Sequence, residues 1–320
     1  DKPCVGGLPG NRTTPIVAAI VAAGGLRMPK TSSRAITSPA GTADVMETLT
    51  HVELSLADMR RVVEREGACL AWGGSVNLAP ADDVLIRVER VLDLDMNAQL
   101  VASVLSKKIA AGAERILIDV PIGPSAKIRS ERQARHLCEL LESVGRESDL
   151  ALEVLYTDGT QPVGRGIGPA LEAHDVLAVI EQREDRPIDL ETRACAIAGR
   201  LLELGGAVAA GEGESRAERL LASGEAAAKL RAICEAQGGW WRPPVASWRH
   251  VVSAPRAGTV AAIDCRRLAR VAKLAGAPAA VAPGVHLQCR LGEHVAGADA
   301  LFEIHAEHRG ELHYPLDYLE

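Results

Sequence analysis

Apolar residues alternate between helical and strand-like spacing from the start of the chain to Gly238. Helical spacing predicts helices over these ranges: 14–23, 55–66 with Ser55 as the cap, 98–111, 132–144, 169–181, 189–204, 215–222 and 225–236. Short apolar runs predict buried strands over 68–72, 116–120 and 151–156. Because helices and strands that alternate in sequence usually form a parallel sheet covered by helices, we predict an α/β fold with a mostly parallel sheet and flanking helices.

The pattern changes after the glycine pair Gly238-Gly239. Two tryptophans and two prolines follow, and then short extended runs separated by glycine turns begin at His250. Such runs are typical of a small β-rich domain, which we expect to form the C-terminal part of the chain.

Composition narrows the function. The chain has 320 residues, 47% of them hydrophobic but only 2% aromatic, so a sizeable core must consist mainly of Ala, Val, Leu and Ile. A net charge of −6 argues against a nucleic-acid surface. The seven cysteines are dispersed, which is typical of reduced thiols in the cytoplasm, and no apolar run is long enough to cross a membrane. We therefore expect a cytoplasmic protein with no nucleic-acid or membrane partner.

Two polar loops carry the candidate chemistry. The loop from Thr31 to Thr42, called the Ser/Thr loop below, holds five hydroxyl residues and Arg34 within positions 31–38, and at Thr42 it leads into an amphipathic run. Hydroxyls, a guanidinium and a helix N-terminus suit an oxyanion such as phosphate, although a polar surface loop capped by Thr42 would look the same. The second loop, from Gly6 to Thr14, is glycine-rich and precedes an apolar helix, which lets backbone N–H groups approach an anion.

These stretches resemble the thymidine phosphorylase and AMP phosphorylase family. The resemblance rests on the following motifs: Lys2 with Gly6-Gly7, 11–14, 32–42, 72–75, 77–83, 103–108 and 163–172. The loop sequence is closer to the AMP phosphorylase branch, and to bacterial proteins named "putative thymidine phosphorylase", than to the best-known thymidine phosphorylases.

The family implies an organisation for the whole chain. Residues 1–76 and 113–238 would form the two parts of the α/β domain, residues 77–112 a segment of a partial helical domain, and residues 239–320 a C-terminal β-rich domain. Family members carry more chain before the first motif, so the sequence is expected to be N-terminally truncated. The family also implies a homo-oligomer.

The implied activity is that of a phosphorylase, a pentosyltransferase. It would cleave the N-glycosidic bond of a nucleoside or nucleoside 5′-monophosphate with phosphate, giving free base and a sugar 1-phosphate. No cofactor is implied, since inorganic phosphate is a co-substrate. By resemblance, the phosphate and nucleotide site would consist of Lys2, Gly7, Thr13, Ser32, Ser33, Arg34, Ala35, Ile36, Thr37, Ser38 and Thr42. The base contacts would be Arg87, Ser103, Lys107 and Lys127, and Asp95 would be the catalytic proton donor.

Several residues allow a second interpretation. Family members commonly have His-Ser after the lysine, where this chain has Pro3-Cys4, and proline cannot titrate. A non-catalytic nucleotide-binding, phosphate-binding or assembly protein that retained the fold is therefore the alternative. Without the family resemblance, the sequence favours a capping or surface aspartate at Asp95 and a solvated helix end at Lys107-Lys108. We predict no metal site, and we expect His305 and His308 to lie at the surface.

Overall fold

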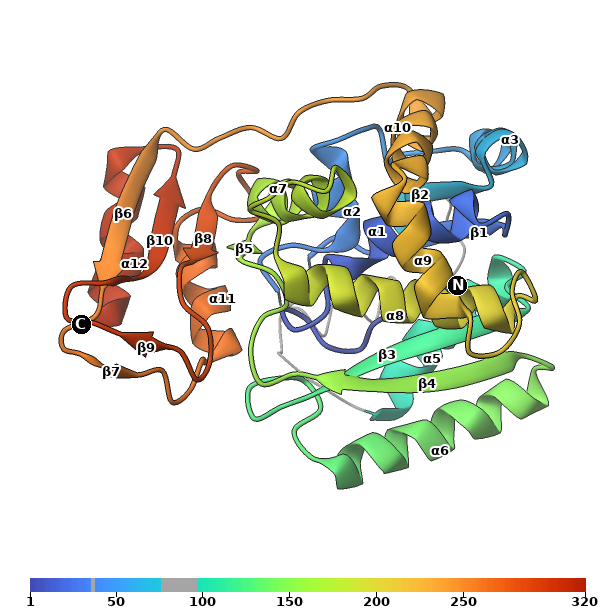
Figure 1. Ribbon diagram of the computed structural model, residues 1–320, viewed down its shortest axis with the longest axis horizontal. Coiled ribbons are helices and arrows are strands. Elements are labelled where there is room, and N and C mark those ends of the chain that lie inside the picture. The colour runs from blue at the N-terminus through green and yellow to red at the C-terminus, as the bar shows by residue number, and fades with distance from the viewer. Residues whose placement is uncertain (36–37, 76–96) are drawn as a thin grey trace.

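The computed structural model describes residues 1–35, 38–75 and 97–320. Figure 1 shows a larger α/β part and a smaller C-terminal part beside it, joined by a long extended connection from α10 to β6.

The strands of the α/β part pair in parallel. Strand β1 (Met28–Ser32) pairs with β2 (Ala68–Trp72), and β3 (Arg115–Ile122) pairs with β4 (Ala151–Asp158). The first residues of the chain also run parallel to β3, since the Val5 backbone nitrogen donates to the Asp119 carbonyl at 2.8 Å. The prediction of an α/β fold with parallel strands is confirmed.

Helices cover these strands close to the predicted positions. They are α1 (Thr13–Ala23), α2 (Thr42–Glu47), α3 (Leu56–Glu66), α5 (Asn97–Ala110), α6 (Glu131–Glu147), α7 (Pro169–Ile180), α8 (Ile188–Leu204), α9 (Gly213–Ala222) and α10 (Glu225–Gln237), with a short 3-10 turn η1 (Gly73–Ser75). Helix α1 is apolar on all sides and lies at the centre of the main core, against α8 and α10. Ser55 caps α3 as expected, because its Oγ accepts a hydrogen bond from the Asp58 backbone nitrogen at 3.1 Å.

The C-terminal part is built on an antiparallel sheet. Its strands are β6 (Trp248–Ser253), β7 (Gly258–Thr259), β8 (Gly284–Leu287), β9 (His294–Val295) and β10 (Ala300–Ala306). The four-stranded sheet has the order β5-β8-β10-β6, and β7 pairs with β9. Strand β5 (Gly166–Ile167) precedes α7 in the chain, so the α/β part contributes one strand to the C-terminal sheet.

The C-terminal part also contains helices that we did not expect: α11 (Cys265–Leu274), the 3-10 turn η2 (Arg309–Leu312) and α12 (His313–Leu319). In α11, Leu268 and Val271 are buried on one side while arginines cover the other. Asp264 caps this helix by accepting hydrogen bonds from the backbone nitrogens of Arg266 and Arg267. The helical spacing is therefore present in the sequence, between runs that we interpreted only as strands.

Within the residues that the structure describes, no helix combines the length and the apolar character needed to span a membrane.

Candidate functional site

The two polar loops meet at one cavity of about 210 Å³. Residues 2–7 line one side of it, and residues 30–34 at the end of β1 line another. The N-terminus of α2 and one face of α5 complete the wall, together with Lys127 from the loop after β3. Segments that lie far apart in sequence therefore form a single site, as the motifs had suggested.

The walls of the cavity are strongly basic. Its lining includes Lys2, Lys30, Arg34, Lys107, Lys108 and Lys127, and no Asp or Glu appears among the described lining residues. Carboxylates lie outside the lining instead, where they form ion pairs with several of the lining lysine and arginine side chains. A site with this distribution of charge favours an anionic ligand.

Lys2 is fixed in the wall by two buried contacts. Its side chain is fully buried, its Nζ donates to Thr13 Oγ1 at 2.5 Å, and it lies 3.5 Å from Asp119 Oδ2. Asp119 in turn accepts a hydrogen bond from Thr157 at 2.6 Å. Thr13 therefore orients the lysine and does not line the cavity, whereas its neighbour Thr14 does.

Lys30 and Lys108 share one carboxylate. Their Nζ atoms lie 2.9 and 2.8 Å from the two oxygens of Asp1, and Lys108 also donates to the Thr31 carbonyl at 2.9 Å. Burial, followed by the adjacent lysines, places the pKa of Lys30 well below its ordinary value. Burial likewise lowers the pKa of Lys108 to about 8. A bound anion would favour the charged form of both side chains.

Hydroxyl groups near these lysines have unused hydrogen-bonding capacity. Thr31 Oγ1 and Ser32 Oγ are buried, and neither has a hydrogen-bond partner in the described part of the chain. Buried hydroxyls without partners are uncommon because desolvation is then uncompensated. Ser32 lies in the lining of the cavity, where an oxyanion could supply its missing partner.

Asp44 folds the Ser/Thr loop onto the start of α2. Its Oδ2 accepts hydrogen bonds from the backbone nitrogens of Ala35 at 2.6 Å and Gly41 at 2.8 Å. At Gly41 a Cβ atom would lie 2.4 Å from the Ser33 carbonyl, so a residue without a side chain is required. This contact brings Ser33 and Thr42 to the same side of the cavity.

Arg34 lines the cavity, but carboxylates hold its guanidinium. It forms an ion pair with Glu47 and contacts Glu53 at 3.1 Å, and it stacks 4.8 Å from the centre of the Trp72 ring. The hydrogen bond to Glu47 raises the pKa of Arg34 above its already high value. Arg34 is therefore oriented by α2 before any ligand binds.

Most of the predicted site residues come together in this cavity. Those that line it are Lys2, Gly7, Ser32, Ser33, Arg34, Ser38, Thr42, Lys107 and Lys127. Ala35 is buried outside the lining, as is Thr13. Ile36, Thr37, Arg87 and Asp95 lie outside the described residues, as does the side chain of Ser103, so their predicted roles stay predictions.

Sequence reasoning missed several lining residues: Asn11, Thr14, Lys30, Lys108, Gly41 and Gly73. The interpretation of Lys108 as part of a solvated helix end is wrong, because it is only 5% exposed. Its position four residues after Val104, on the apolar side of the predicted helix, was the available signal in the sequence.

Pro3 and Cys4, which replace the family's His-Ser, also line the cavity. Burial and the nearby Asp119 carboxylate raise the pKa of the Cys4 thiol far above its ordinary value, so the thiol is neutral at physiological pH. Neither residue can carry a charge into the site.

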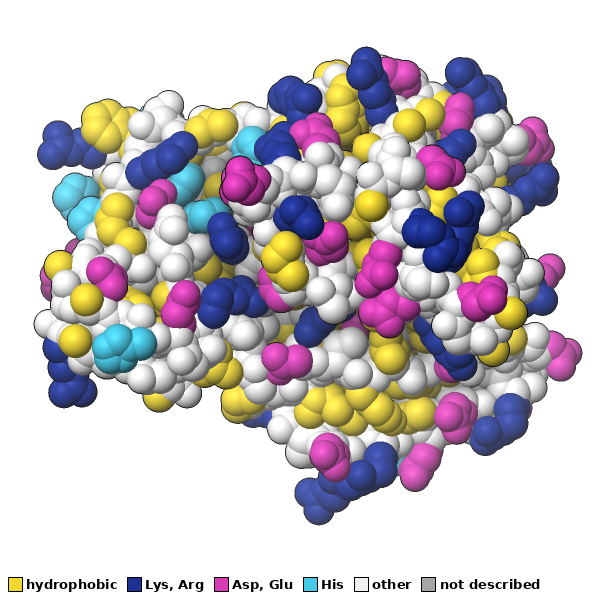
Figure 2. All heavy atoms as spheres, in the orientation of Figure 1, with side chains coloured by type: hydrophobic (Ala, Val, Ile, Leu, Met, Phe, Trp, Pro, Cys, Tyr) yellow, Lys and Arg dark blue, Asp and Glu magenta, His cyan; other side chains and the backbone are white. Residues whose placement is uncertain are grey.

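The C-terminal histidines form a separate cluster. Figure 2 shows histidine side chains gathered on the C-terminal part of the molecule. The expectation that His305 lies at the surface is wrong: it is 5% exposed and its Nε2 lies 3.2 Å from Glu303, whereas His308 is exposed. Among the residues described, no group of three or more His, Cys, Asp or Glu could hold a metal ion.

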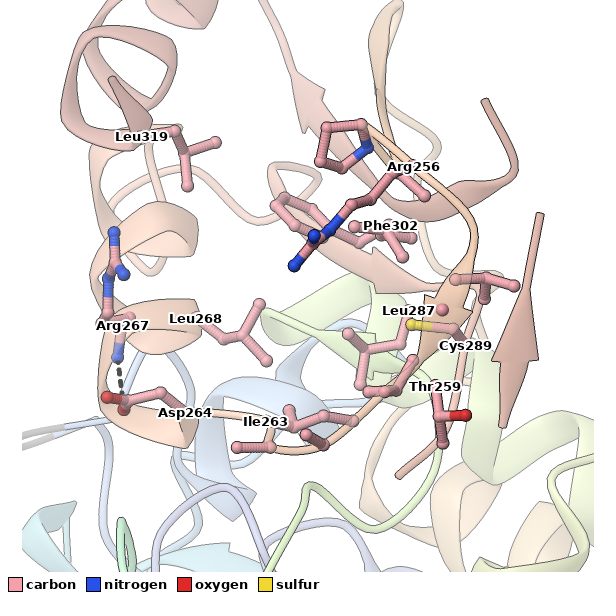
Figure 3. A pocket seen from close by; sticks show the side chains of 18 of the residues that line it. Arg256, Thr259, Ile263, Asp264, Arg267, Leu268, Leu287, Cys289, Phe302 and Leu319 are labelled. Atoms are coloured by element: carbon pink, nitrogen blue, oxygen red, sulfur yellow. Dashed lines mark hydrogen bonds between the residues drawn. The ribbon is translucent and has the colours of Figure 1, made fainter. Parts of the chain in front are cut away.

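A larger cavity of about 700 Å³ lies inside the C-terminal part (Figure 3). Its walls are mainly apolar, with Leu268, Leu287 and Phe302 among them, and the Arg256 side chain extends into it. It lacks the convergent cations and hydroxyls of the smaller cavity, which is therefore the better candidate for anion chemistry.

The fold and the site together define a class of protein: an α/β protein with a basic, hydroxyl-lined cavity. Residues 1–227 match the family described as "Glycosyl transferase family, a/b domain". The chain belongs to this family.

Curated relatives are similar in sequence to almost the whole chain. A protein from Chelativorans sp. (strain BNC1) named "Putative thymidine phosphorylase" is 59% identical over 318 residues, covering 99% of this chain and 62% of the relative. One of the same name from Hahella chejuensis (strain KCTC 2396) is 57% identical over 319 residues, covering 100% of this chain and 63% of the relative. The resemblance to the thymidine phosphorylase family is confirmed, and the chain spans about 62% of the length of such relatives.

Solved structures support the fold. The anthranilate phosphoribosyltransferase (TrpD) from Thermus thermophilus matches with a TM-score of 0.57 at 20% identity, covering 74% of this chain and 77% of that one. The enzyme from Saccharomyces cerevisiae in complex with PRPP and Mg matches with a TM-score of 0.54 at 15% identity, covering 74% of this chain and 73% of that one. At this identity, the similarity concerns the fold alone.

Proposed function

We propose that the chain is the phosphate-binding and sugar-binding part of a phosphorylase. The reaction would transfer the pentosyl group of a nucleoside or nucleoside 5′-monophosphate, of the thymidine or AMP type, to inorganic phosphate. The observation that carries the proposal is the cavity lined by Lys2, Lys30, Lys107, Lys108 and Lys127, beside a Ser32 hydroxyl that has no partner among the residues described.

The chemistry of phosphorolysis requires such a site. The transition state has oxocarbenium character, so the phosphate nucleophile must be held in line with the breaking C–N bond. Fixed cations and hydroxyls can do this without reorganisation, and orientation of this kind contributes roughly 7–11 kcal/mol. No metal or organic cofactor is needed in this scheme, since phosphate is the co-substrate.

The leaving base must also receive a proton. Pro3 cannot supply one, and the raised pKa of the Cys4 thiol makes it too weak an acid, so we assign this role to Asp95 on the basis of the family resemblance. If it is correct, Asp95→Asn should lower kcat by about 10²–10⁴-fold with little change in KM, because general acid catalysis acts on the transition state. Steady-state kinetics with a pH profile tests this. A variant with near wild-type kcat and an unchanged profile would exclude Asp95 as the acid.

The activity is tested by phosphate-dependent release of free base from AMP, CMP, UMP, thymidine and uridine. Lys107→Ala should weaken turnover, whereas Lys229→Ala should not, since Lys229 pairs with Glu66 at 3.2 Å on a different surface. Turnover of none of the five substrates by a full-length protein would overturn the enzymatic proposal.

The second candidate, a non-catalytic phosphate-binding or nucleotide-binding protein, is favoured by Pro3-Cys4 in the cavity wall. Calorimetry separates the two. Phosphate binding without turnover of any of the five substrates would support this candidate.

A further inference from the structure

The glycine-rich loop of residues 6–14, which forms one side of the phosphate cavity, is anchored in the C-terminal part. Leu8 is 3% exposed and packs in the same apolar cluster as Leu268, Val285 and Ile304. Asn11 and Thr14 of this loop line the cavity. The loop therefore contacts the proposed ligand site and the C-terminal core at the same time.

Arg12 makes a second attachment from the same loop. Its side chain is fully buried, with Nη1 3.0 Å from Asp175 Oδ2 and Nη2 3.5 Å from Glu172 Oε1. The same Asp175 oxygen accepts hydrogen bonds from the backbone nitrogens of Arg165 at 2.7 Å and Gly166 at 2.8 Å. Asp175 thus links the loop to the segment 162–167, which contains β5.

Arg290, between β8 and β9, grips the same segment from the C-terminal part. It donates to the carbonyls of Pro162 at 3.1 Å and Gly164 at 2.9 Å, and it forms an ion pair with Asp189. Asp189 in turn accepts a hydrogen bond from the Gly164 backbone nitrogen at 3.0 Å. Segment 162–167 therefore lies between Arg12 on one side and Arg290 on the other.

Close packing makes this arrangement sensitive to displacement. At Gly164 a Cβ atom would lie 2.6 Å from Asp175 Oδ2 and 3.0 Å from Arg12 Cδ. In the described part of the chain, Arg12 Nε and both carboxylate oxygens of Glu172 are buried without a hydrogen-bond partner. A buried ionic cluster that satisfies its members so incompletely contributes little net stability, which favours a role in positioning.

We propose that Arg12 is a positioning residue: with segment 162–167 and Arg290 it forms a clasp through which the C-terminal part holds the loop 6–14 in its phosphate-binding conformation. The proposal rests on the proposed function of the cavity as a phosphate site. It predicts that phosphate affinity depends on residues of the C-terminal part that do not touch the ligand.

Calorimetry with inorganic phosphate on the whole chain tests the clasp. Arg290→Ala should weaken phosphate binding at least fivefold, and hydrogen exchange of residues 6–14 should become faster. The matched control is Arg242→Ala, which also removes an arginine from an ion pair, here with Glu181 at 2.8 Å, but leaves segment 162–167 untouched. Equal affinity and equal exchange in the two variants would overturn the clasp.

Two further results keep the test decisive. If Arg290→Ala does not fold, Asp189→Asn replaces it in the test. This variant removes only the charge that faces Arg290, and it should weaken phosphate binding at least twofold; unchanged affinity would overturn the clasp.

If the wild-type chain binds no phosphate, the proposed function fails, and hydrogen exchange alone then tests the clasp. Unchanged exchange of residues 6–14 in Arg290→Ala, or in Asp189→Asn, would overturn it.

Discussion

At the scale of single residues, Glu172 is a buried carboxyl group whose two oxygens have no hydrogen-bond partner in the described part of the chain. It is fully buried, and burial raises its pKa from 4.5 to about 7 even though Arg12 lies 3.5 Å away. Desolvation therefore outweighs the attraction of one guanidinium that is itself buried and only partly hydrogen-bonded. A carboxyl group in this state gives the folded protein a dependence on pH near neutrality.

The sign of that dependence follows from proton linkage. Between pH 4.5 and 7 the folded chain keeps a proton on Glu172 that the unfolded chain releases, so stability falls as pH rises through this window. Glu172→Gln should remove this contribution, which amounts to about 3 kcal/mol. Urea unfolding of wild type and variant at pH 5 and pH 8 measures it, with the exposed Glu64→Gln as the control. Parallel pH profiles of wild type and Glu172→Gln would contradict the assignment.

The hydroxyls of the Ser/Thr loop carry a second prediction. Ser33 and Thr42 line the cavity from the ends of the loop that Asp44 folds. Ser33→Ala and Thr42→Ala each remove one donor to a charged ligand, which is worth roughly 1.5–3 kcal/mol. Phosphate calorimetry should show the loss without a change in thermal unfolding, and Thr259→Ala, at an exposed position in β7, should leave affinity unchanged. Unaltered affinity in both loop variants would place the phosphate elsewhere.

The sequence alone could not predict which of two neighbouring residues lines the cavity. Thr13 and Thr14 are chemically equivalent in the sequence, and only the helical geometry at the start of α1 decides which of them lines the cavity. Lys30 sits in the middle of a strand, where alternation alone does not reveal that its charge points toward Asp1. The positions of these side chains depend on contacts between residues far apart in sequence, which no local sequence pattern encodes.

At the scale of elements, helix α5 brings two lysines to the cavity. Lys108 has a pKa lowered to about 8 by burial, so it loses its charge as pH rises through that value. Sulfate stays a dianion over this range, so binding of sulfate by the wild-type chain should weaken severalfold between pH 7 and pH 9. Lys108→Arg keeps the charge, and its fall in affinity should be smaller. Calorimetry at the two pH values tests this, and an equal fall in both proteins would contradict it.

Elements were predicted well where one periodicity dominates. Helices α1, α8 and α10 and strands β2, β3 and β4 lie within a few residues of their predicted positions, since each has a clear apolar repeat or a terminating glycine. Helix α11 was missed because its apolar residues are separated by arginines and flanked by strand-like runs. Strand β5 has only two residues, and its pairing with β8 forms across more than 100 positions of chain, so no local signal exists.

At the scale of the whole molecule, strand pairing, apolar packing and hydrogen bonds cross between the α/β part and the C-terminal part besides the covalent connection. Strand β5 pairs with β8, Leu8 and Ile167 pack in the C-terminal core, and Arg290 grips the segment 162–164. The connection from α10 to β6 runs as an extended segment over the surface (Figure 1). We therefore expect the α/β part and the C-terminal part to stay together even when this connection is cut.

Cleavage of this connection tests that expectation. A protease site inserted between the exposed Pro244 and Val245 should be cut without separating the fragments, which should elute together in size-exclusion chromatography at neutral pH. Leu8→Asp in the same cleavable protein should promote separation, because it places a charge in the apolar cluster that joins the two parts. The control is an apolar substitution at a core position far from this interface, Leu230→Met in α10, which should leave the fragments together. If the fragments of the protein without Leu8→Asp separate in native buffer, the connection rather than the interface holds the two parts together, and the C-terminal part could not restrain the phosphate loop as proposed.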